Sequence, residues 1–188
     1  MPSSISRRPA GQRLIAFLRA INVGGHVVTM DRLRKEFEAL GFTGVETFIA
    51  SGNVIFTAPK GDLAALEKKI EARLRKSLGY EVATFVRTCD EVAAVAGHRP
   101  FARIGDEATI FVGFIERPLT AADTRAVMTF KSEIDDFHVK GREVYWLRKT
   151  RQTDSPFKYV SLEKKLNVRV TFRGLNTVAR LAAKHGPS

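Results

Sequence analysis

Two short segments of the chain gather residue types that hold anions. Residues 19–25 read R-A-I-N-V-G-G, and residues 51–53 read S-G-N. Glycine lets backbone N–H groups come close to a ligand, while arginine, asparagine and serine side chains add hydrogen-bond donors. The alternative is that the glycines form tight turns and the asparagines bond to loop backbone. As a site, the segments would form a small pocket for an anion or phosphate, with these candidate residues: Arg19, Asn22, Gly24, Gly25, Ser51, Gly52 and Asn53.

A third segment, residues 171–178, reads T-F-R-G-L-N-T-V and leads from an expected strand into the last expected helix. We expect Asn176 to be the N-cap of this helix. A helix N-terminus favours negative charge, and the Arg173 guanidinium and the Thr177 hydroxyl add donors that suit a phosphate or carboxylate. Ordinary helix capping beside a surface arginine is the alternative interpretation.

Residues for catalysis are sparse. The four histidines, His26, His98, His138 and His185, are scattered without metal-ligand spacing, so the sequence predicts neither a metal nor a cofactor. His26 lies on the glycine loop, a position from which it could act as an acid or base. Cys89 has no partner histidine nearby in the sequence, which favours a structural role for its thiol. The catalytic residues, if there are any, stay unassigned.

The first half of the chain contains the elements that must position these loops. Thr29 and Asp62 are good N-caps, and Gly41 and Gly79 end the two helices that follow them. Period-two and period-3.6 apolar patterns predict strands at residues 13–20, 45–50, 54–57 and 82–87 and helices at residues 30–40 and 63–78. This order, β-α-β-β-α-β, is that of a ferredoxin-like unit.

The second half repeats the order. Strands are expected at residues 108–115, 134–139, 143–147 and 168–172, and helices at residues 120–130, 156–166 and 176–184. The predicted fold is therefore α+β, with two ferredoxin-like (βαββαβ) subdomains and an extra C-terminal helix. The predicted boundaries are a disordered tail at 1–12, a first subdomain at 13–88, a connector at 89–107 with a short helix, and a second subdomain at 108–188.

This topology brings the two glycine-asparagine loops together. The first two strands of a split βαβ unit run parallel, because a right-handed helical crossover joins them. Their C-terminal ends, and the loops that follow, then lie at one edge of the sheet. The strands at residues 14–18 and 110–115 are apolar on both faces, which predicts that the open sheet face is covered by the other half or by a second copy.

The charge of the chain is uneven. Of a net charge of +11, residues 140–184 carry +9, from 12 Lys/Arg and 3 acidic residues. A basic block of this kind favours a polyanion, an anionic small molecule or an acidic protein surface, or else it is a solvated face that aids solubility. No apolar run approaches the roughly 18 residues of a membrane span, and a single cysteine fits a reducing cytoplasm. We expect a cytoplasmic protein without a membrane partner.

These motifs resemble the domain-of-unknown-function 1697 family. The resemblance rests on L-R-A-I-N-V-G-G at residues 18–25, S-G-N-V-x-F at 51–56 and T-x-R-x-x-N-T-V at 171–178, and it covers about residues 13–184. It implies a bacterial-type cytoplasmic protein with two ferredoxin-like subdomains and no established activity. The family often reads R-G-I-N-V-G-G and T-x-R-N-W-N-T, so this chain departs from it at Ala20 and at Gly174-Leu175.

Three functions are compatible with the sequence. The first is a binding module for an anionic ligand, nucleic acid or a nucleotide, that uses the basic C-terminal region. The second is a small-molecule enzyme with its site at the edge formed by residues 22–25 and 51–53. The third is a structural or interaction protein without a ligand. The expected partners are nucleic acid or a phosphate-bearing small molecule, and the expected state is a monomer or homodimer.

Overall fold

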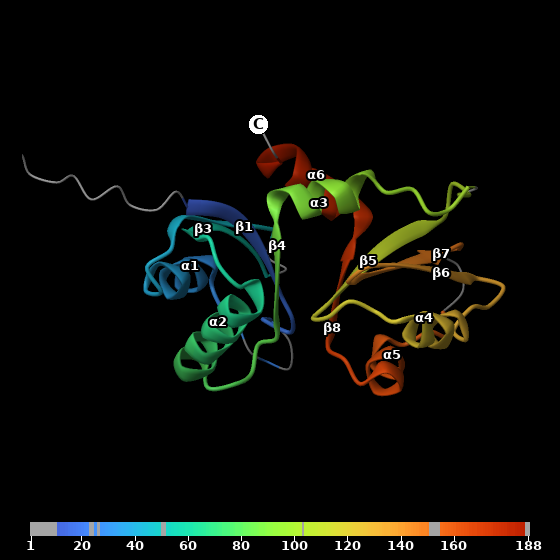
Figure 1. Cartoon of the computed structure of the whole chain (residues 1–188), viewed down its shortest axis with the longest axis horizontal. Coiled ribbons are helices and arrows are strands. Elements are labelled where there is room, and N and C mark those ends of the chain that lie inside the picture. Colours follow the sequence, from blue (N-terminus) through green and yellow to red (C-terminus); the bar gives the residue numbers. More distant parts are fainter. Residues whose placement is uncertain are drawn as a thin grey trace, which may run out of the picture.

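The computed structural model describes residues 11–22, 25, 27–49, 52–102, 104–150 and 155–186. The chain forms two halves side by side, with two further helices lying across their boundary (Figure 1). The first half contains β1 (Gly11–Leu18), α1 (Met30–Glu38), β2 (Thr43–Phe48), β3 (Asn53–Pro59), α2 (Leu63–Leu78) and β4 (Thr84–Thr88). The helix α3 (Cys89–Gly97) follows, within the segment predicted as a connector.

The second half repeats this arrangement. It contains β5 (Thr109–Ile115), α4 (Ala121–Met128), β6 (Asp135–Lys140), β7 (Glu143–Arg148), α5 (Tyr159–Leu166) and β8 (Val170–Gly174), followed by α6 (Leu175–His185). The sheet orders are β2-β3-β1-β4 and β6-β7-β5-β8, and every pair of neighbouring strands is antiparallel. The predicted α+β fold with two ferredoxin-like halves is confirmed.

Local signals set most of the element boundaries. Thr29 caps α1 by accepting a hydrogen bond from the Arg32 N–H, and Asp62 caps α2 in the same way through the Ala64 N–H. Gly79 ends α2 in the left-handed conformation, at φ 83°, which only glycine adopts without steric cost. These predicted caps are confirmed, and they orient the apolar stripes of α1 and α2 onto the sheet.

Two predicted helix starts are wrong. Gly174, and not Asn176, is the N-cap of α6. Because β8 runs to Gly174 and the helix follows without a loop, Asn176 falls inside the first turn. The helix predicted from Pro156 begins at Tyr159, where Lys158 is still extended. The Ser155 hydroxyl bonds the Asp135 carboxylate and accepts from the Phe157 N–H, which holds this segment against β6 instead of in a helix.

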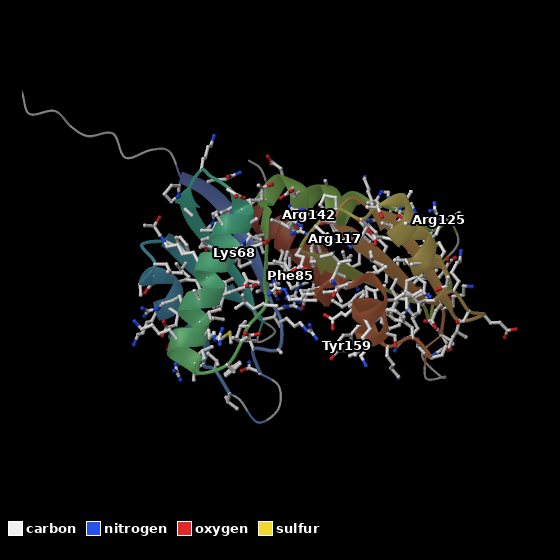
Figure 2. The ribbon with its side chains drawn as sticks, turned by 60° about the horizontal axis from the view of Figure 1, so that its bottom comes forward. Lys68, Phe85, Arg117, Arg125, Arg142 and Tyr159 are labelled. Carbon is white, nitrogen blue, oxygen red and sulfur yellow. The ribbon has the colours of Figure 1, made fainter. Side chains whose placement is uncertain are left out.

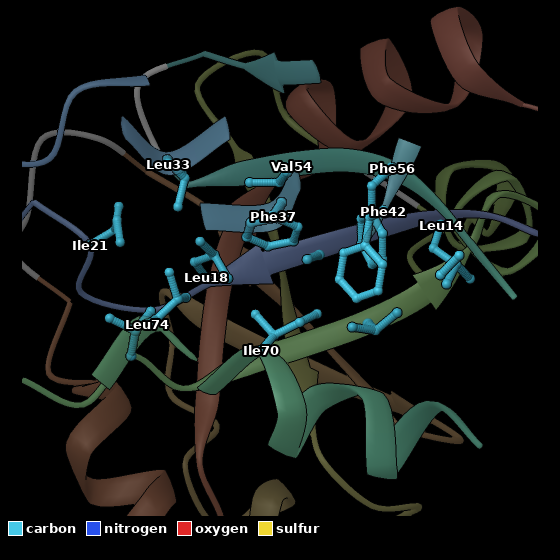
Figure 3. Packing of buried hydrophobic residues seen from close by; sticks show 14 of the residues in the cluster. Leu14, Leu18, Ile21, Leu33, Phe37, Phe42, Val54, Phe56, Ile70 and Leu74 are labelled. Atoms are coloured by element: carbon cyan, nitrogen blue, oxygen red, sulfur yellow. The ribbon is translucent and has the colours of Figure 1, made fainter. Parts of the chain in front are cut away.

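The first sheet packs its outer face against α1 and α2. Leu14, Leu18, Val54 and Phe56 on the strands meet apolar side chains from both helices, among them Phe37 (Figure 3). Each of these side chains is buried. The second sheet is covered in the same way by α4 and α5. Each half therefore has a core of its own on one face of its sheet.

The other faces of the two sheets share a third core. Phe17 of β1 and Phe114 of β5 stack with ring centroids 3.9 Å apart, and α3 and α6 contribute Val92, Val178 and Leu181. All five side chains are buried. The prediction that the open sheet face is covered is thus confirmed, and the cover is the other half of the chain. None of the helices in the described part of the chain is both long and apolar enough to span a bilayer.

Carboxylates close the edge of the first sheet. The outward N–H groups of Thr84, Val86 and Thr88 on β4 donate to glutamates at 2.9, 2.7 and 2.8 Å. The acceptors are Glu71, Glu67 and Glu91, respectively. An edge strand with free N–H groups pairs readily with other chains, so these glutamates protect β4. Burial of Glu67 raises the pKa of its carboxyl.

Glu67→Gln tests the cost of this buried charge. A carboxyl whose pKa is raised by folding favours the protonated state, so its contribution to stability falls as the pH rises above its ordinary pKa of 4.5. Glutamine keeps an oxygen for the Val86 N–H and carries no charge. We expect the variant to melt at a higher temperature than the parent at pH 7 and at a similar temperature at pH 4, in thermal unfolding followed by circular dichroism. A variant that melts lower at pH 7 would contradict this assignment.

Candidate functional site

Asn53 lies at the centre of the predicted edge and is completely buried. Its Nδ2 donates to the Phe48 carbonyl at 3.0 Å, which closes the turn between β2 and β3. Its Oδ1 accepts from Arg173 Nε at 2.7 Å. The S-G-N segment of the first half and the T-F-R-G segment of the second half are therefore in direct contact, although 120 residues separate them.

Arg173 uses every nitrogen of its guanidinium group, and two of them, Nε and Nη2, connect the halves. Besides the bond to Asn53, Nη2 donates to the Leu18 carbonyl at 2.7 Å, and Nη1 donates to Thr171 Oγ1 and to the Phe172 carbonyl, both at 2.9 Å. Burial lowers its pKa to about 10, so it stays charged at neutral pH. The guanidinium also lies 6.0 Å from the centroid of the Phe17 ring.

Gly52 brings the two loops of the first half together. Its carbonyl accepts from the Leu18 N–H at 2.8 Å. A Cβ at this position would lie 2.9 Å from Ile21 Cγ2, and the φ of 75° favours glycine in any case. The predicted convergence of the loops after β1 and β2 is thus confirmed at their bases.

Two further predicted side chains, those of Asn22 and Arg19, also have partners within the protein. Asn22 Oδ1 accepts from the Val28 N–H at 2.8 Å, which spans the glycine loop. Arg19 forms an ion pair with Glu163 on α5, and its guanidinium lies 5.6 Å from the Tyr159 ring centroid. Asn176 is exposed and Thr177 is half-buried in the first turn of α6. Gly25 has φ 85° with open space around it, and Gly24, Ser51 and His26 lie outside the described residues.

An aromatic groove of about 510 Å³ opens beside this edge. Its lining combines five rings with two cations and one exposed aliphatic side chain: Ile49, Phe111, Trp146, Phe157, Lys158, Tyr159, Phe172, Arg173, Gly174 and Thr177. Phe111 and Trp146 stack with centroids 4.8 Å apart, and Phe157 meets Trp146 edge-on at 4.9 Å. Flat walls of this kind suit a planar ring.

Ile49 is strained and exposed at the mouth of this groove. Its φ is 57°, a value that is an outlier for a β-branched residue. The side chain is nevertheless 45% exposed to solvent. Backbone strain of about 1–3 kcal/mol is typically kept only where the surrounding structure or a function demands it, which makes this position the strongest local sign of a ligand site.

Asp135 fixes the position of the groove's tryptophan. The carboxylate is completely buried and accepts from Trp146 Nε1 at 2.7 Å and from the Ser155 hydroxyl at 2.9 Å. The Ser132 hydroxyl lies 3.1 Å from its second oxygen. These bonds hold the indole ring and the start of the segment that carries Phe157 in fixed positions, so the groove is preformed.

A basic groove of about 860 Å³ lies on the other side of Arg19. It is lined by the turn after β1, one face of α2, the segment that precedes β4 and one residue of the second half: Arg19, Ala20, Lys68, Glu71, Ala72, Arg75, Lys76, Glu81, Val82, Ala83 and Arg169. Five cations and two carboxylates give this lining a formal charge of +3. Its chemistry is that of an anion-binding surface.

Part of the basic C-terminal block pairs with carboxylates across the boundary between the halves. Arg142 pairs with Glu91 at 2.8 Å, Arg169 with Glu71 at 2.9 Å, and Lys184 with Glu46 at 3.4 Å. In each pair the carboxylate belongs to α3 or to the first half. Folding therefore partly neutralises the positive charge of residues 140–184. The basic groove takes three of its five cations from α2, which lies outside this block.

Chemical groups for catalysis do not converge in the described residues. Burial raises the pKa of the Cys89 thiol, which makes it a poor nucleophile. The rings of His98 and His138 lie 5.1 Å apart, and burial lowers the pKa of His98. Within the described ranges, no group of three or more His, Cys, Asp or Glu side chains is arranged to hold a metal ion.

Of the residues that line the two grooves, only Arg19, Arg173 and Thr177 were among the site residues predicted from the sequence. The one available signal was the Tyr145-Trp146 pair among basic residues. Adjacent strand residues point to opposite faces, and accordingly Tyr145 enters the shared core while Trp146 lines the groove. The other rings come from separate strands and loops, so only the strand register brings them together.

Comparison with known proteins identifies the family to which this chain belongs. Residues 12–145, more than half of the chain, match the profile of a family described as a protein of unknown function, DUF1697. The chain belongs to the DUF1697 family. The matched DUF1697 segment contains both glycine-asparagine loops and ends before Arg173.

A solved structure supports the fold of this DUF1697 protein. The conserved bacterial protein SP0830 from Streptococcus pneumoniae aligns with it at a TM-score of 0.71 and 22% sequence identity, over 93% of this chain and 98% of that chain. At this identity the likeness concerns the fold alone. No curated protein matches the sequence.

Ala20→Gly is expected to stabilise this DUF1697 protein. Ala20 has φ 58°, where an L-residue costs about 1–2 kcal/mol, and the resemblance described above has glycine here. After the entropy cost of glycine, we expect a net gain of roughly 0.5–1 kcal/mol in the free energy of unfolding, measured by urea denaturation. Ala72→Gly, in the exposed middle of α2, is the control and should lose about 1 kcal/mol. Equal losses in both variants would contradict the strain at Ala20.

A double-mutant cycle tests the Asn53–Arg173 bond. Asn53→Ala leaves the Phe48 carbonyl and Arg173 Nε without this partner inside the protein, and we expect a loss of about 3 kcal/mol in the free energy of unfolding. Arg173→Ala should cost at least as much. Because the residues share one bond, the double variant should lose less than the sum by about 1 kcal/mol or more. Additive losses in urea denaturation would show that the bond contributes nothing of its own.

Proposed function

We propose that this protein binds a ligand in which a flat aromatic ring carries an anionic group, the class to which nucleotides belong. The aromatic groove supports this proposal most directly, because five rings and two cations line one preformed cavity. Ligand sites are typically mostly apolar hollows of about 300–1,000 Å³ with a few well-placed polar groups. The groove's volume and lining match that description.

The rings provide the binding energy for a base. Stacking on an aromatic side chain contributes about 1–3 kcal/mol per base and tolerates every base, because each has a π-face. Tyr159 is 49% exposed and Ile49 is 45% exposed, so both have surface that a ligand can cover. The strain at Ile49 is then offset by the contact that its side chain makes with the ligand.

The charged end of the ligand is accommodated at the junction of β8 and α6. Lys158 and Arg173 both line the groove and bring positive charge to it. Thr177 brings a hydroxyl from the first turn of α6, and no side chain of the described residues caps this helix. All of these groups favour a phosphate or carboxylate over a neutral substituent.

Binding is better supported than catalysis. The side chains of Asn22 and Asn53, which the enzyme hypothesis placed at the loop edge, form hydrogen bonds within the protein. Neither faces a described nucleophile or base. The groove itself is lined mainly by rings and cations, a lining that suits the binding of a planar anion.

We place this binding in the cytoplasm. Cys89 is the only cysteine of the chain, and its thiol is free and buried. Chains that work in oxidising compartments commonly rely on disulfides, which this sequence cannot form internally. A cytoplasmic location also gives the groove access to the pool of free nucleotides and nucleic acids.

Trp146 reports directly on the groove, because it is the only tryptophan of the sequence. We expect AMP, GMP, CMP or UMP to change its fluorescence in a saturable titration, and to raise the melting temperature of the protein at the same concentrations. Lys158→Ala should weaken binding, with Lys60→Ala as the control outside the groove. Tyr159→Ala should weaken it too, with the neighbouring Val160→Ala as its control. No response to any of the four nucleotides at millimolar concentration would overturn the proposal.

A further inference from the structure

The basic groove and the aromatic groove adjoin each other. Arg19 lines the basic groove, and its guanidinium lies 5.6 Å from the ring centroid of Tyr159, which lines the aromatic groove. In Figure 2, Lys68 on α2 and Tyr159 on α5 lie on the two sides of the boundary between the halves. The helices α2 and α5 lie on the same side of the molecule, opposite α3 and α6 (Figure 1).

The carboxylates of the basic groove are already paired. Glu71 accepts from Arg169 at 2.9 Å and from the Thr84 N–H at 2.9 Å, and Glu81 lies 3.4 Å from Arg75. Lys68 and Lys76 are exposed, and neither forms an ion pair with any residue that the structure describes. The groove therefore presents cations that are available to an external anion.

The cations follow the length of α2. Lys68 and Lys76 are eight residues apart, which corresponds to about 12 Å along the helix, and Arg75 lies beside the second of them. A stripe of this length offers separate positions for successive charges. It suits a ligand with several phosphates in a row better than a single phosphate.

From this arrangement we infer that the ligand is single-stranded nucleic acid, an inference that rests on the proposed function of the aromatic groove. One base stacks in the aromatic groove, and the phosphate backbone passes Arg19 and continues along α2. A duplex does not fit this arrangement, because its bases are stacked on one another and are not available to protein rings. Proteins that bind single strands combine a basic channel with aromatic platforms in this way.

The test compares a labelled twelve-residue oligouridine with UMP. We expect the oligonucleotide, followed by fluorescence anisotropy, to bind at least about tenfold more tightly than UMP, followed by Trp146 fluorescence, and a twelve-base-pair duplex to bind more weakly than the single strand. The affinity for the oligonucleotide should fall with salt, by about 0.7 in the logarithmic slope for each phosphate contact.

Charge reversal separates the two grooves. The double variant Lys68→Glu/Lys76→Glu should weaken oligonucleotide binding by roughly tenfold or more and reduce its salt slope by about 1.4, while UMP binding stays unchanged. The control Lys35→Glu/Lys60→Glu changes the net charge equally, at an α1 position and a loop position outside both grooves, and should have a much smaller effect.

The outcomes separate this inference from the proposed function. If UMP binds but the oligonucleotide binds no more tightly, or if the α2 variant and the control lose affinity equally, the inference fails and the nucleotide site stands. If the oligonucleotide binds through α2 while UMP has no effect on Trp146, the aromatic groove is not the base site, and both proposals fail as stated. Tighter binding of the duplex would also overturn the inference.

Discussion

The buried guanidinium of Arg173 is the interaction on which the rest of the structure depends. Its charge is largely withdrawn from water and is satisfied by the Leu18 carbonyl and Asn53 of the first half. A charge removed from water is costly unless hydrogen bonds compensate for it. The two halves must therefore meet in the one arrangement that provides these acceptors. The stacked rings of Phe17 and Phe114 fill the core beside it.

This closure determines which surfaces of the two sheets stay accessible. A ferredoxin-like sheet usually offers one open face, but here both sheets direct that face into the shared core. What remains accessible is the boundary between the halves and the part of the second sheet's outer face at Phe111 and Trp146 that forms the aromatic groove. Both grooves occur there, on either side of Arg19. The pairing of two similar halves thus buries the open face of each sheet and leaves two adjoining grooves accessible.

The order of the elements could be predicted from sequence because it depends on local chemistry. Thr29, Asp62 and Gly79 end or begin helices through contacts within a few residues. The start of α5 could not be predicted in this way, because the Ser155–Asp135 bond that delays it joins residues 20 positions apart. The aromatic groove depends on longer separations still. The loop edge was predictable as a meeting point, but the role of Arg173 as its partner was not.

Strain marks the two grooves in different ways. Ala20 lies two residues after β1 with φ 58°, and Ile49 follows β2 with φ 57°. Each residue lines one groove. Glycine would satisfy both backbones at lower cost, and at position 20 an alanine adds only a methyl group in return. Isoleucine at position 49 adds an exposed apolar side chain to a groove lining that also contains five rings. The folded protein leaves the Ile49 side chain about half exposed to solvent. The backbone strain at Ile49 is explained if a bound aromatic ring completes the burial of this side chain.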